Sequence, residues 1–525
     1  MTRHFPSVFC VLLCSSCLIG SRCPAGTLII DTPITLGPGD ASMENQQVDV
    51  VEGGQLKIEG VHTFQQLLVE GTVEIDGDAE LAVIGQVRVT DLGVIRFLSV
   101  ADDGLVEGVW AGHGGTLSAG SMEVAFGGHV SADGTGYKGV FRGAGLGPGG
   151  GAASARDQYA GGGGYGGAGA DRSAPGGLPY GSYRFPVDLG SAGGAETATS
   201  TFPGASGGGA IRLIVSGSMV LEGTVSADGG RSDHYYIGSG SGGSIWATVG
   251  SLSGAGVFRA NGGTKSFNGT GGAGGGGRIA VYCGDDSAYT GATASVCLGG
   301  VEEIPGAPGT IGFFNLDGTR LDVFQTMTFD AVSEHVFGDV VLSADARVVL
   351  GGGATLVTTG SLALRDTARL TIDSIDNDQL VDGVWVGRGG TIEAVNLSIA
   401  EQAVITADGM GYKGRFRGVG MGPGGGAASL LYLKAGGGGY GGAGGDADVS
   451  GGGIYGSYRE PLELGSAGGA ETGSSLKPGG SGGGAVRLLV TGTLALAGRI
   501  SADGSNSDQY YNGSGSGGSI WATVG

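Results

Sequence analysis

Short segments with alternating apolar and polar residues follow one another along most of this chain. Residues 71–77 (GTVEIDG), 79–85 (AELAVIG) and 86–90 (QVRVT) are three such segments with hardly any residues between them, and residues 346–350 and 360–364 repeat the pattern. Alternation with period two predicts β-strands that are buried on one face. Connections this short and regular do not allow a hairpin at each one. We therefore expect the strands to form successive sides of a coiled parallel solenoid, in which each coil packs its inward residues on the next.

The chain also contains a long tandem duplication. Trp385 follows Trp110 by 275 residues (385 − 110), and the same offset relates the sequence GSYR at residues 181–184 to residues 456–459. Self-similarity at a fixed offset indicates a repeat architecture. We expect one solenoid copy at residues 27–300 and a second at residues 301–525. The second copy lacks the last part of the first, and we interpret it as truncated, with the chain a fragment of a longer protein.

A glycine-dense insert interrupts each copy, at about residues 134–209 and again at about residues 409–484. A structureless loop of this length is unusual in a compact domain. We therefore expect glycine-rich segments that pack against a coil, with Tyr165, Tyr180 and Tyr183 as anchors in the first insert.

Composition supports an extended β architecture. Glycine supplies 120 of 525 residues, which excludes an ordinary helical protein because glycine costs roughly 1 kcal/mol relative to alanine inside a helix. Collagen is excluded because the glycines keep no period of three, and disorder is disfavoured because 40% of the residues are apolar. The formal net charge of −21 and the absence of a basic stripe argue against nucleic-acid binding.

The first 26 residues predict a cleaved secretory signal, because Arg3 precedes a short apolar core that ends in small residues. No other segment approaches eighteen uninterrupted apolar residues, so we expect no transmembrane span in the mature chain. Cys283 and Cys297 are the cysteines outside the N-terminal region. In an oxidising compartment they predict a disulfide, and two unpaired buried thiols are the alternative. Cysteines at the spacing of a zinc site are absent from the body of the chain, and we expect no metal.

A short corner motif, Ala-(Asp/Asn)-Gly, follows several of the expected strands. Its five versions are residues 130–134, 225–229, 258–262, 405–409 and 500–504.

Together with residues 207–213 (GGGAIRL), 242–246 (GGSIW) and 274–282 (GGGGRIAVY), this motif resembles the glycine-rich repeats of large extracellular proteins of protists and bacteria. Those repeats are similar to pectin-lyase-like right-handed parallel β-helices. The resemblance implies an adhesin-like, secreted or surface-displayed solenoid, without a family-wide catalytic set.

The repeated aspartates at the corners are the main candidates for chemistry. Asp133, Asp228, Asp408 and Asp503 recur at equivalent places and would stack along one edge of the coil. Aspartate before glycine at a strand end is an ordinary turn residue whose side chain bonds the backbone two residues on, and Asn261 replaces it in one version. Calcium binding and carboxylate catalysis are the alternatives.

Other catalytic patterns are weak. The histidines are scattered, and Arg388 stands where the first copy has His113. No glycine-rich loop follows a strand, opens a helix and carries the lysine of a P-loop, so we expect neither a nucleotide nor another cofactor.

Two residue types suggest contact with carbohydrate. Trp110, Trp246, Trp385 and Trp521 could stack on sugars, although an isolated tryptophan on a strand is more often part of a core. Sequons for N-glycosylation occur at Asn268, Asn396 and Asn512, and chance is the alternative for each.

The sequence therefore predicts an all-β protein, a right-handed parallel β-helix or solenoid in two tandem copies with long glycine-rich inserts. We expect a secreted or cell-surface structural or adhesive module without catalysis, with extracellular glycans or surface proteins as partners. A polysaccharide-degrading enzyme on the same scaffold and a glycan-binding module are the alternatives.

Overall fold

The computed structural model describes residues 26–198, 200–264 and 271–525. The predicted all-β class is confirmed: within these residues the helical structure is a single 3-10 turn, η1 (Ala292–Ala294), and the rest is strands and irregular chain. None of the described residues belongs to a helix long and apolar enough to cross a membrane. The signal sequence expected at residues 1–26 falls, except for its last residue, outside the described residues.

The strands form one long sheet of 18 strands, two shorter sheets of seven and five strands, and one pair. The long sheet contains β1 (Thr27–Ile30), β3 (Gln47–Val50), β5 (Val61–Phe64), β6 (Gln66–Val69), β8 (Glu80–Val89), β12 (Thr116–Val124), β14 (Ala210–Leu221), β16 (Ser244–Gly254), β18 (Arg278–Tyr289), β19 (Thr310–Asn315), β20 (Arg320–Val323), β22 (Glu334–Phe337), β23 (Asp339–Leu342), β25 (Thr355–Leu364), β27 (Gly390–Ile399), β29 (Ala485–Val490), β30 (Leu494–Leu496) and β32 (Ser519–Val524).

The seven-stranded sheet contains β2 (Pro33–Leu36), β4 (Gln55–Ile58), β7 (Thr72–Ile75), β9 (Val94–Phe97), β13 (His129–Ser131), β15 (Thr224–Ser226) and β17 (Val257–Arg259). The five-stranded sheet contains β21 (Thr326–Phe329), β24 (Arg347–Leu350), β26 (Arg369–Ile372), β28 (Val404–Thr406) and β31 (Arg499–Ser501). The separate pair is β10 (Ser99–Val100) with β11 (His113–Gly114).

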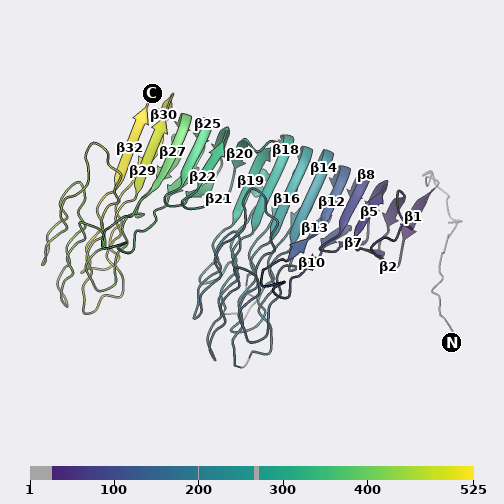
Figure 1. The fold of residues 1–525 in the computed structure, drawn as a ribbon, viewed down its shortest axis with the longest axis horizontal. Coiled ribbons are helices and arrows are strands. Elements are labelled where there is room, and N and C mark those ends of the chain that lie inside the picture. The colour runs from purple at the N-terminus through teal and green to yellow at the C-terminus, as the bar shows by residue number, and fades with distance from the viewer. Residues whose placement is uncertain (1–25, 199, 265–270) are drawn as a thin grey trace.

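Along the chain, one or more strands of the long sheet are followed by a single strand of a short sheet. Strand β7 is followed by β8 in the long sheet and then by β9, which returns beside β7. Pairings between the named strands are parallel except β10 with β11 and β19 with β20. The strands consequently lie side by side in chain order along the whole length of the molecule (Figure 1).

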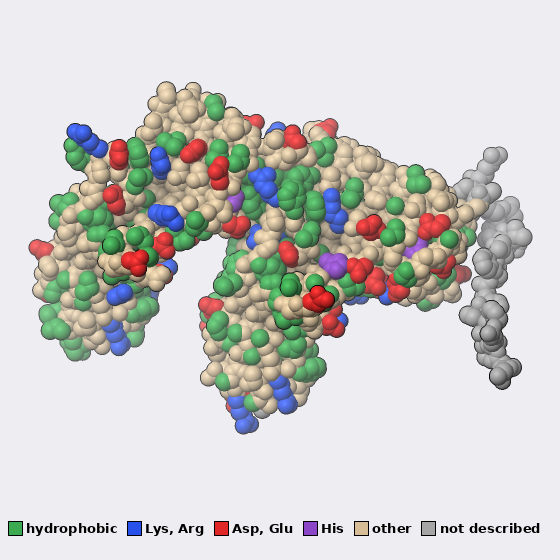
Figure 2. All heavy atoms as spheres, in the orientation of Figure 1, with side chains coloured by type: hydrophobic (Ala, Val, Ile, Leu, Met, Phe, Trp, Pro, Cys, Tyr) green, Lys and Arg blue, Asp and Glu red, His purple; other side chains and the backbone are tan. Residues whose placement is uncertain are grey.

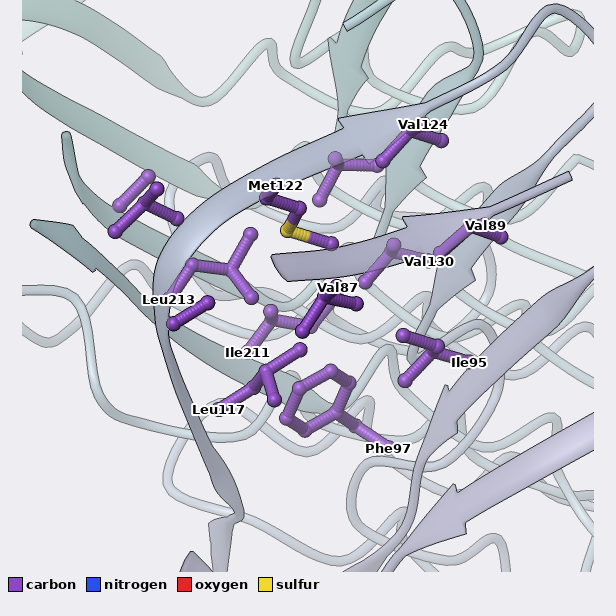
Figure 3. Packing of buried hydrophobic residues seen from close by; sticks show 14 of the residues in the cluster. Val87, Val89, Ile95, Phe97, Leu117, Met122, Val124, Val130, Ile211 and Leu213 are labelled. Carbon is purple, nitrogen blue, oxygen red and sulfur yellow. The ribbon is translucent and has the colours of Figure 1, made fainter. Parts of the chain in front are cut away.

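Alternation along each strand places one set of side chains between the sheets. Equivalent inward positions stack from strand to strand. One such column is Val48, Leu67, Val87, Met122, Met219 and Leu252, and each of these six side chains is at most 1% exposed. Figure 3 shows Val87 and Met122 facing Ile95 and Val130, which come from the seven-stranded sheet. The core is thus an apolar stack between two parallel sheets. Burial stabilises it by roughly 25 cal/mol for each Å² of apolar surface removed from water.

Long strands of the large sheet bend at a glycine. The register shifts between Ala119 and Met122 in β12, and again where β14 passes Gly217. A Cβ atom added to Gly217 or Gly250 would lie 2.7 Å from the carbonyl oxygen of the glycine one strand earlier. At Gly217 and Gly250 neighbouring backbones approach too closely for a side chain, whereas β27 shifts its register past Val395, the counterpart of Gly120.

The core changes at β19. Phe313 belongs to the apolar cluster that begins at Ile30, whereas Phe314 and Leu321 belong to a second cluster that continues to Ala502. Strand β19 pairs with β18 on one side and forms a short antiparallel pair with β20 on the other. The division into two copies near residue 300 remains a prediction, and this change of core is the structural feature closest to it.

The first insert also contacts the second copy. Tyr183 is 5% exposed, and its hydroxyl lies 3.0 Å from Nδ1 of His335. The Arg184 guanidinium donates to the carbonyl oxygen of Val336 at 2.7 Å and lies 4.1 Å from the centre of the Phe337 ring. A segment of the first insert therefore binds β22 of the second copy and helps to join the two.

The glycine-rich inserts lie between β13 and β14 and between β28 and β29, and hang from one side of the strand array as two lobes (Figures 1 and 2). Segment 161–164, at the centre of the first lobe, is fully buried and has backbone hydrogen bonds to six other segments. The bonds it donates run from Gly161 to Ala152, Gly162 to Ala170, Gly163 to Ser239 and Gly164 to Gly149, and those it accepts come from Gly194, Gly177 and Gly275.

The direction of these bonds repeats after three residues, which is the period of an extended left-handed helix without internal hydrogen bonds. The lobe is therefore a bundle of extended glycine helices bonded to one another on all sides. Tyr165 is fully buried at its base, as expected of an anchor.

This packing predicts different outcomes for one substitution at equivalent sites. A Cβ at Gly166 would collide with the carbonyl oxygen of Gly277, whereas nothing lies within 4 Å of one at Gly441, its counterpart in the second copy. We expect Gly166→Ala to lower the free energy of unfolding by about 1–3 kcal/mol. Gly441→Ala should be neutral or stabilising by about 0.5 kcal/mol, because alanine restricts the unfolded chain.

Urea unfolding of the two variants, followed by circular dichroism, tests this expectation. Equal effects of the two substitutions would contradict the close packing of the first lobe.

Candidate functional site

The corner aspartates form a ladder of hydrogen bonds between successive coils. Oδ1 of Asp133 accepts the backbone N–H of Asp228 at 2.6 Å, and Oδ1 of Asp228 accepts that of Asn261 at 2.8 Å. Oδ1 of Asn261 in turn accepts the N–H of Leu298 at 2.8 Å. In the second copy, Asp408 accepts the N–H of Asp503 at 2.7 Å.

The ladder corrects the expected role of these side chains. They bond the corner of the next coil, not the backbone two residues on, and an asparagine serves equally because its oxygen is also an acceptor. The second oxygen of Asp133 accepts the Ser226 hydroxyl at 2.9 Å, and Ser501 bonds Asp408 at the same distance. In the part of the chain that the structure describes, no cluster of three or more His, Cys, Asp or Glu side chains could hold a metal ion.

Trp246 lies in a pocket of about 270 Å³ on the outer face of the long sheet. Strand β16 carries it, and β14 places Arg212 beside it in register. The Arg212 guanidinium lies 3.7 Å from the centre of the indole ring, and Phe185 of the insert packs edge-on at 5.4 Å. His113 lines the same pocket.

Arg212 is held by the strands, not by a carboxylate. Its guanidinium donates to the carbonyl oxygen of Trp246 and to the Thr248 hydroxyl, both at 3.0 Å. Burial lowers the pKa of Arg212 to about 10, so it stays charged at neutral pH. One face of Trp246 is therefore covered by a cation. The indole ring of Trp246 is therefore not open for the predicted stacking on a sugar.

The equivalent tryptophan of the second copy is more open. Trp521 lies in β32, and Arg487 is 5.0 Å from its ring centre. Glu460 stands where the first copy has Phe185, and among the described residues no aromatic ring packs on Trp521.

Trp110 and Trp385 belong to small apolar clusters at the bases of the inserts. Trp110 packs edge-on against Tyr137 at 5.1 Å, and Trp385 against Tyr412 at 5.0 Å. Each tryptophan is half-buried, and its buried tyrosine partner belongs to a cluster with a buried leucine, Leu189 or Leu464. These contacts match the alternative that both tryptophans are core residues.

The histidines are separated, and those with buried rings have structural partners. Nδ1 of His62 lies 2.9 Å from Oε1 of Glu44, and His335 bonds Tyr183 as described above. His113 bonds the Ala111 carbonyl and the Asp78 carboxylate. Partial burial lowers the pKa of His113, but these two bonds outweigh it and leave the pKa above its usual value.

The predicted disulfide is absent: Cys283 and Cys297 are free, buried thiols. Sγ of Cys297 bonds the carbonyl oxygen of Thr310 at 3.3 Å, and Thr310 pairs with Arg278 at the start of β18. Cys283 is farther along the same strand, at roughly 3.3 Å per residue, so the thiols are too distant for a disulfide. Burial raises the pKa of both thiols.

The three sequons differ in environment. Asn396 is exposed in β27, whereas Asn268 lies outside the described residues. Asn512 is 9% exposed, and its Nδ2 donates to Ser475 and to the carbonyl oxygen of Lys477. A glycan on Nδ2 would replace one of its two N–H groups and break at least one of these bonds, so Asn512 is a structural residue in this fold.

No protein-family model, curated protein or solved structure matches the chain. Sequence reasoning missed Arg212 and Phe185 as the cover of Trp246. The signal for the arginine was present, since Arg212 and Arg487 recur at the offset of the duplication in IRLIV and VRLLV.

The ladder predicts a pH-dependent contribution to stability. Burial raises the pKa of Asp228 from 3.8 to about 6, and Asp133 adds to this while Arg259 opposes it. The folded state therefore holds this proton more tightly than the unfolded state, and the contribution to stability is lost as pH rises from about 4 to 6. Asp228→Asn keeps an acceptor for Asn261. We expect the variant to gain up to about 3 kcal/mol relative to the wild type between pH 4 and pH 7.

Asp408→Asn is the control with the opposite sign. Burial raises the pKa of Asp408, but hydrogen bonds from the Asp503 N–H, Thr406 and Ser501, together with Arg499, lower it below its usual value. Its contribution to stability is present above about pH 4 and is lost as pH falls, so this variant should lose stability at neutral pH relative to acid. Unfolding free energies at pH 4 and pH 7 decide for Asp228→Asn, and those at about pH 2 and pH 7 decide for Asp408→Asn; the same sign for both variants would refute the assignment.

Proposed function

We propose that the chain is a secreted or cell-surface module of the right-handed parallel β-helix type, with a structural or adhesive role and no catalysis. The alternation of strands between stacked parallel sheets supports the solenoid interpretation. The resemblance to glycine-rich repeats of extracellular proteins, and the apolar N-terminal segment of the sequence, support export.

One observation carries the proposal. The repeated carboxylates, which are the best candidates for chemistry, already accept backbone N–H groups of the neighbouring coil and recur as such in both copies. An enzyme would need a group of catalytic side chains that can contact the substrate and that is distinct from the residues repeated in every coil. A ladder that fixes each coil to the next fits an elongated scaffold.

The test is incubation of the chain with acidic and neutral polysaccharides. We expect neither new reducing ends nor unsaturated uronides above the level of a heat-denatured sample. Release of either product, abolished by Asp133→Asn or Asp228→Asn, would overturn the proposal in favour of a polysaccharide-degrading enzyme.

Glycan binding without turnover is the second candidate, and the openness of Trp521 favours it. Sugar rings stack on exposed aromatic faces, and Arg487 and Glu460 would flank such a ring with polar groups. Trp246 is the matched control because Arg212 and Phe185 cover it.

Affinity electrophoresis in gels containing each polysaccharide measures this binding. We expect Trp521→Ala to weaken retardation about tenfold in apparent Kd, which corresponds to about 1.4 kcal/mol, and Trp246→Ala to leave it unchanged. Equal loss in both variants, or none in either, would reject the site.

A further inference from the structure

A segment of the first copy covers the side of its glycine lobe. Residues 271–282, here called the covering segment, run along the lobe and continue into β18. The N–H of Gly275 donates to the carbonyl oxygen of Gly163, and that of Gly167 donates to Gly276, both at 2.9 Å. Beyond this point the segment pairs with β16, from Arg278 opposite Ser244 onward.

The covering segment also supplies a charge. Arg278 is 3% exposed, and its Nε donates to the carbonyl oxygen of Tyr180 at 2.9 Å. Its guanidinium interacts with the Asp188 carboxylate, which burial would otherwise leave uncompensated. Burial raises the pKa of Asp188, and Arg278 opposes the rise.

The same surface of the second copy is uncovered. Residues 438–443 and 514–518, together with β32, are here called the open face. Gly441, Gly442 and Ser514 are exposed, whereas their counterparts 275 residues earlier are buried. Within the part of the chain that the structure describes, the N–H groups of Gly442 and Ser514 have no backbone partner. A hollow of about 430 Å³ lies on this face.

Two further features match the missing segment. Strand β32 pairs with β29 on one edge, and no other described strand pairs with it. Glu463 stands in the place of Asp188 and accepts the Tyr440 hydroxyl at 3.2 Å.

We propose that the open face binds an extended chain that carries a Gly-Gly-x-Gly-Gly-Gly-Gly-Arg segment followed by a β-strand. The glycines lie on Gly441, where a side chain on either partner prevents contact, as the close approach of Gly166 to Gly277 in the first copy indicates. The arginine pairs with Glu463, and the strand adds to β32 by backbone hydrogen bonds. This inference deepens the structural role proposed above and rests on it, because the face joins one repeat to the next in the way the first copy is already joined.

The probe is a fluorescent synthetic peptide of the covering segment, GGAGGGGRIAVY, titrated against the full chain by fluorescence anisotropy. We expect saturable binding. Replacement of the peptide glycine that corresponds to Gly275 by valine should abolish binding, because a Cβ there meets the carbonyl oxygen of Gly167 in the first copy. Replacement of its arginine by alanine should weaken binding about tenfold.

Variants of the chain locate the site. Gly441→Val should fold normally, since nothing lies within 4 Å of its Cβ, and should lose peptide binding, because a Cβ at its counterpart Gly166 meets the carbonyl oxygen of Gly277 in the covering segment. Gly104→Val is the matched control, because its Cβ is equally unobstructed, and it should bind like the wild type. Glu463→Gln should weaken binding of the wild-type peptide and leave binding of the arginine-to-alanine peptide unchanged.

Absence of binding, or undiminished binding by Gly441→Val, would overturn the inference. Either result would leave the non-catalytic role intact, because that role is tested by polysaccharide turnover. Turnover, in contrast, would reject the proposed function whatever the peptide does.

Discussion

Backbone hydrogen bonding between successive coils is the interaction on which the rest of this structure depends. In the strand region it is an ordinary parallel ladder, and alternation leaves every second side chain for the core. In the lobes the same requirement is met by extended glycine segments, in which one central segment bonds six neighbours. Backbones this close exclude a Cβ, so the high glycine content follows from main-chain geometry. The conformational entropy that glycine loses on folding is offset by nearly complete pairing of buried N–H and C=O groups.

Side chains serve mainly to fix one coil relative to the next. The aspartate ladder occupies the corners, where the strands end and the backbone has no strand partner in the next coil. Arg212 spans from its own strand to the carbonyl oxygen of Trp246 and the hydroxyl of Thr248 one strand later. Tyr183 and Arg184 do the same on a larger scale, between the first insert and β22. The polar groups that resemble catalytic candidates in the sequence are therefore already bonded within the scaffold.

The part of this architecture that is local in sequence could be predicted. Alternation over four residues identified strands such as β7 and β24, and the boundaries of both inserts agree with the ends of β13 and β28 and the starts of β14 and β29. The packing of the first lobe, in which one segment bonds six others, could not be predicted. Gly163 bonds Ser239 and Gly275, and a run of glycines carries no pattern that encodes these partners. The disulfide prediction failed for a related reason. Two cysteines close in sequence are separated by most of a strand, and only the register of β18 with β19 reveals it.

The two copies show that a repeat takes its properties from its neighbour. The sequence GSYR occurs in both, yet Tyr183 is 5% exposed against β22 while Tyr458 is 89% exposed. On the outer surface Phe185 becomes Glu460 and His113 becomes Arg388, whereas the corner aspartates, the tryptophans and the paired arginines are kept. In a stacked array the intrinsic energy of a unit is supplemented by its interfaces. Positions that bond coil to coil are thus constrained by geometry in each copy, and those on the outer surface are free to specialise.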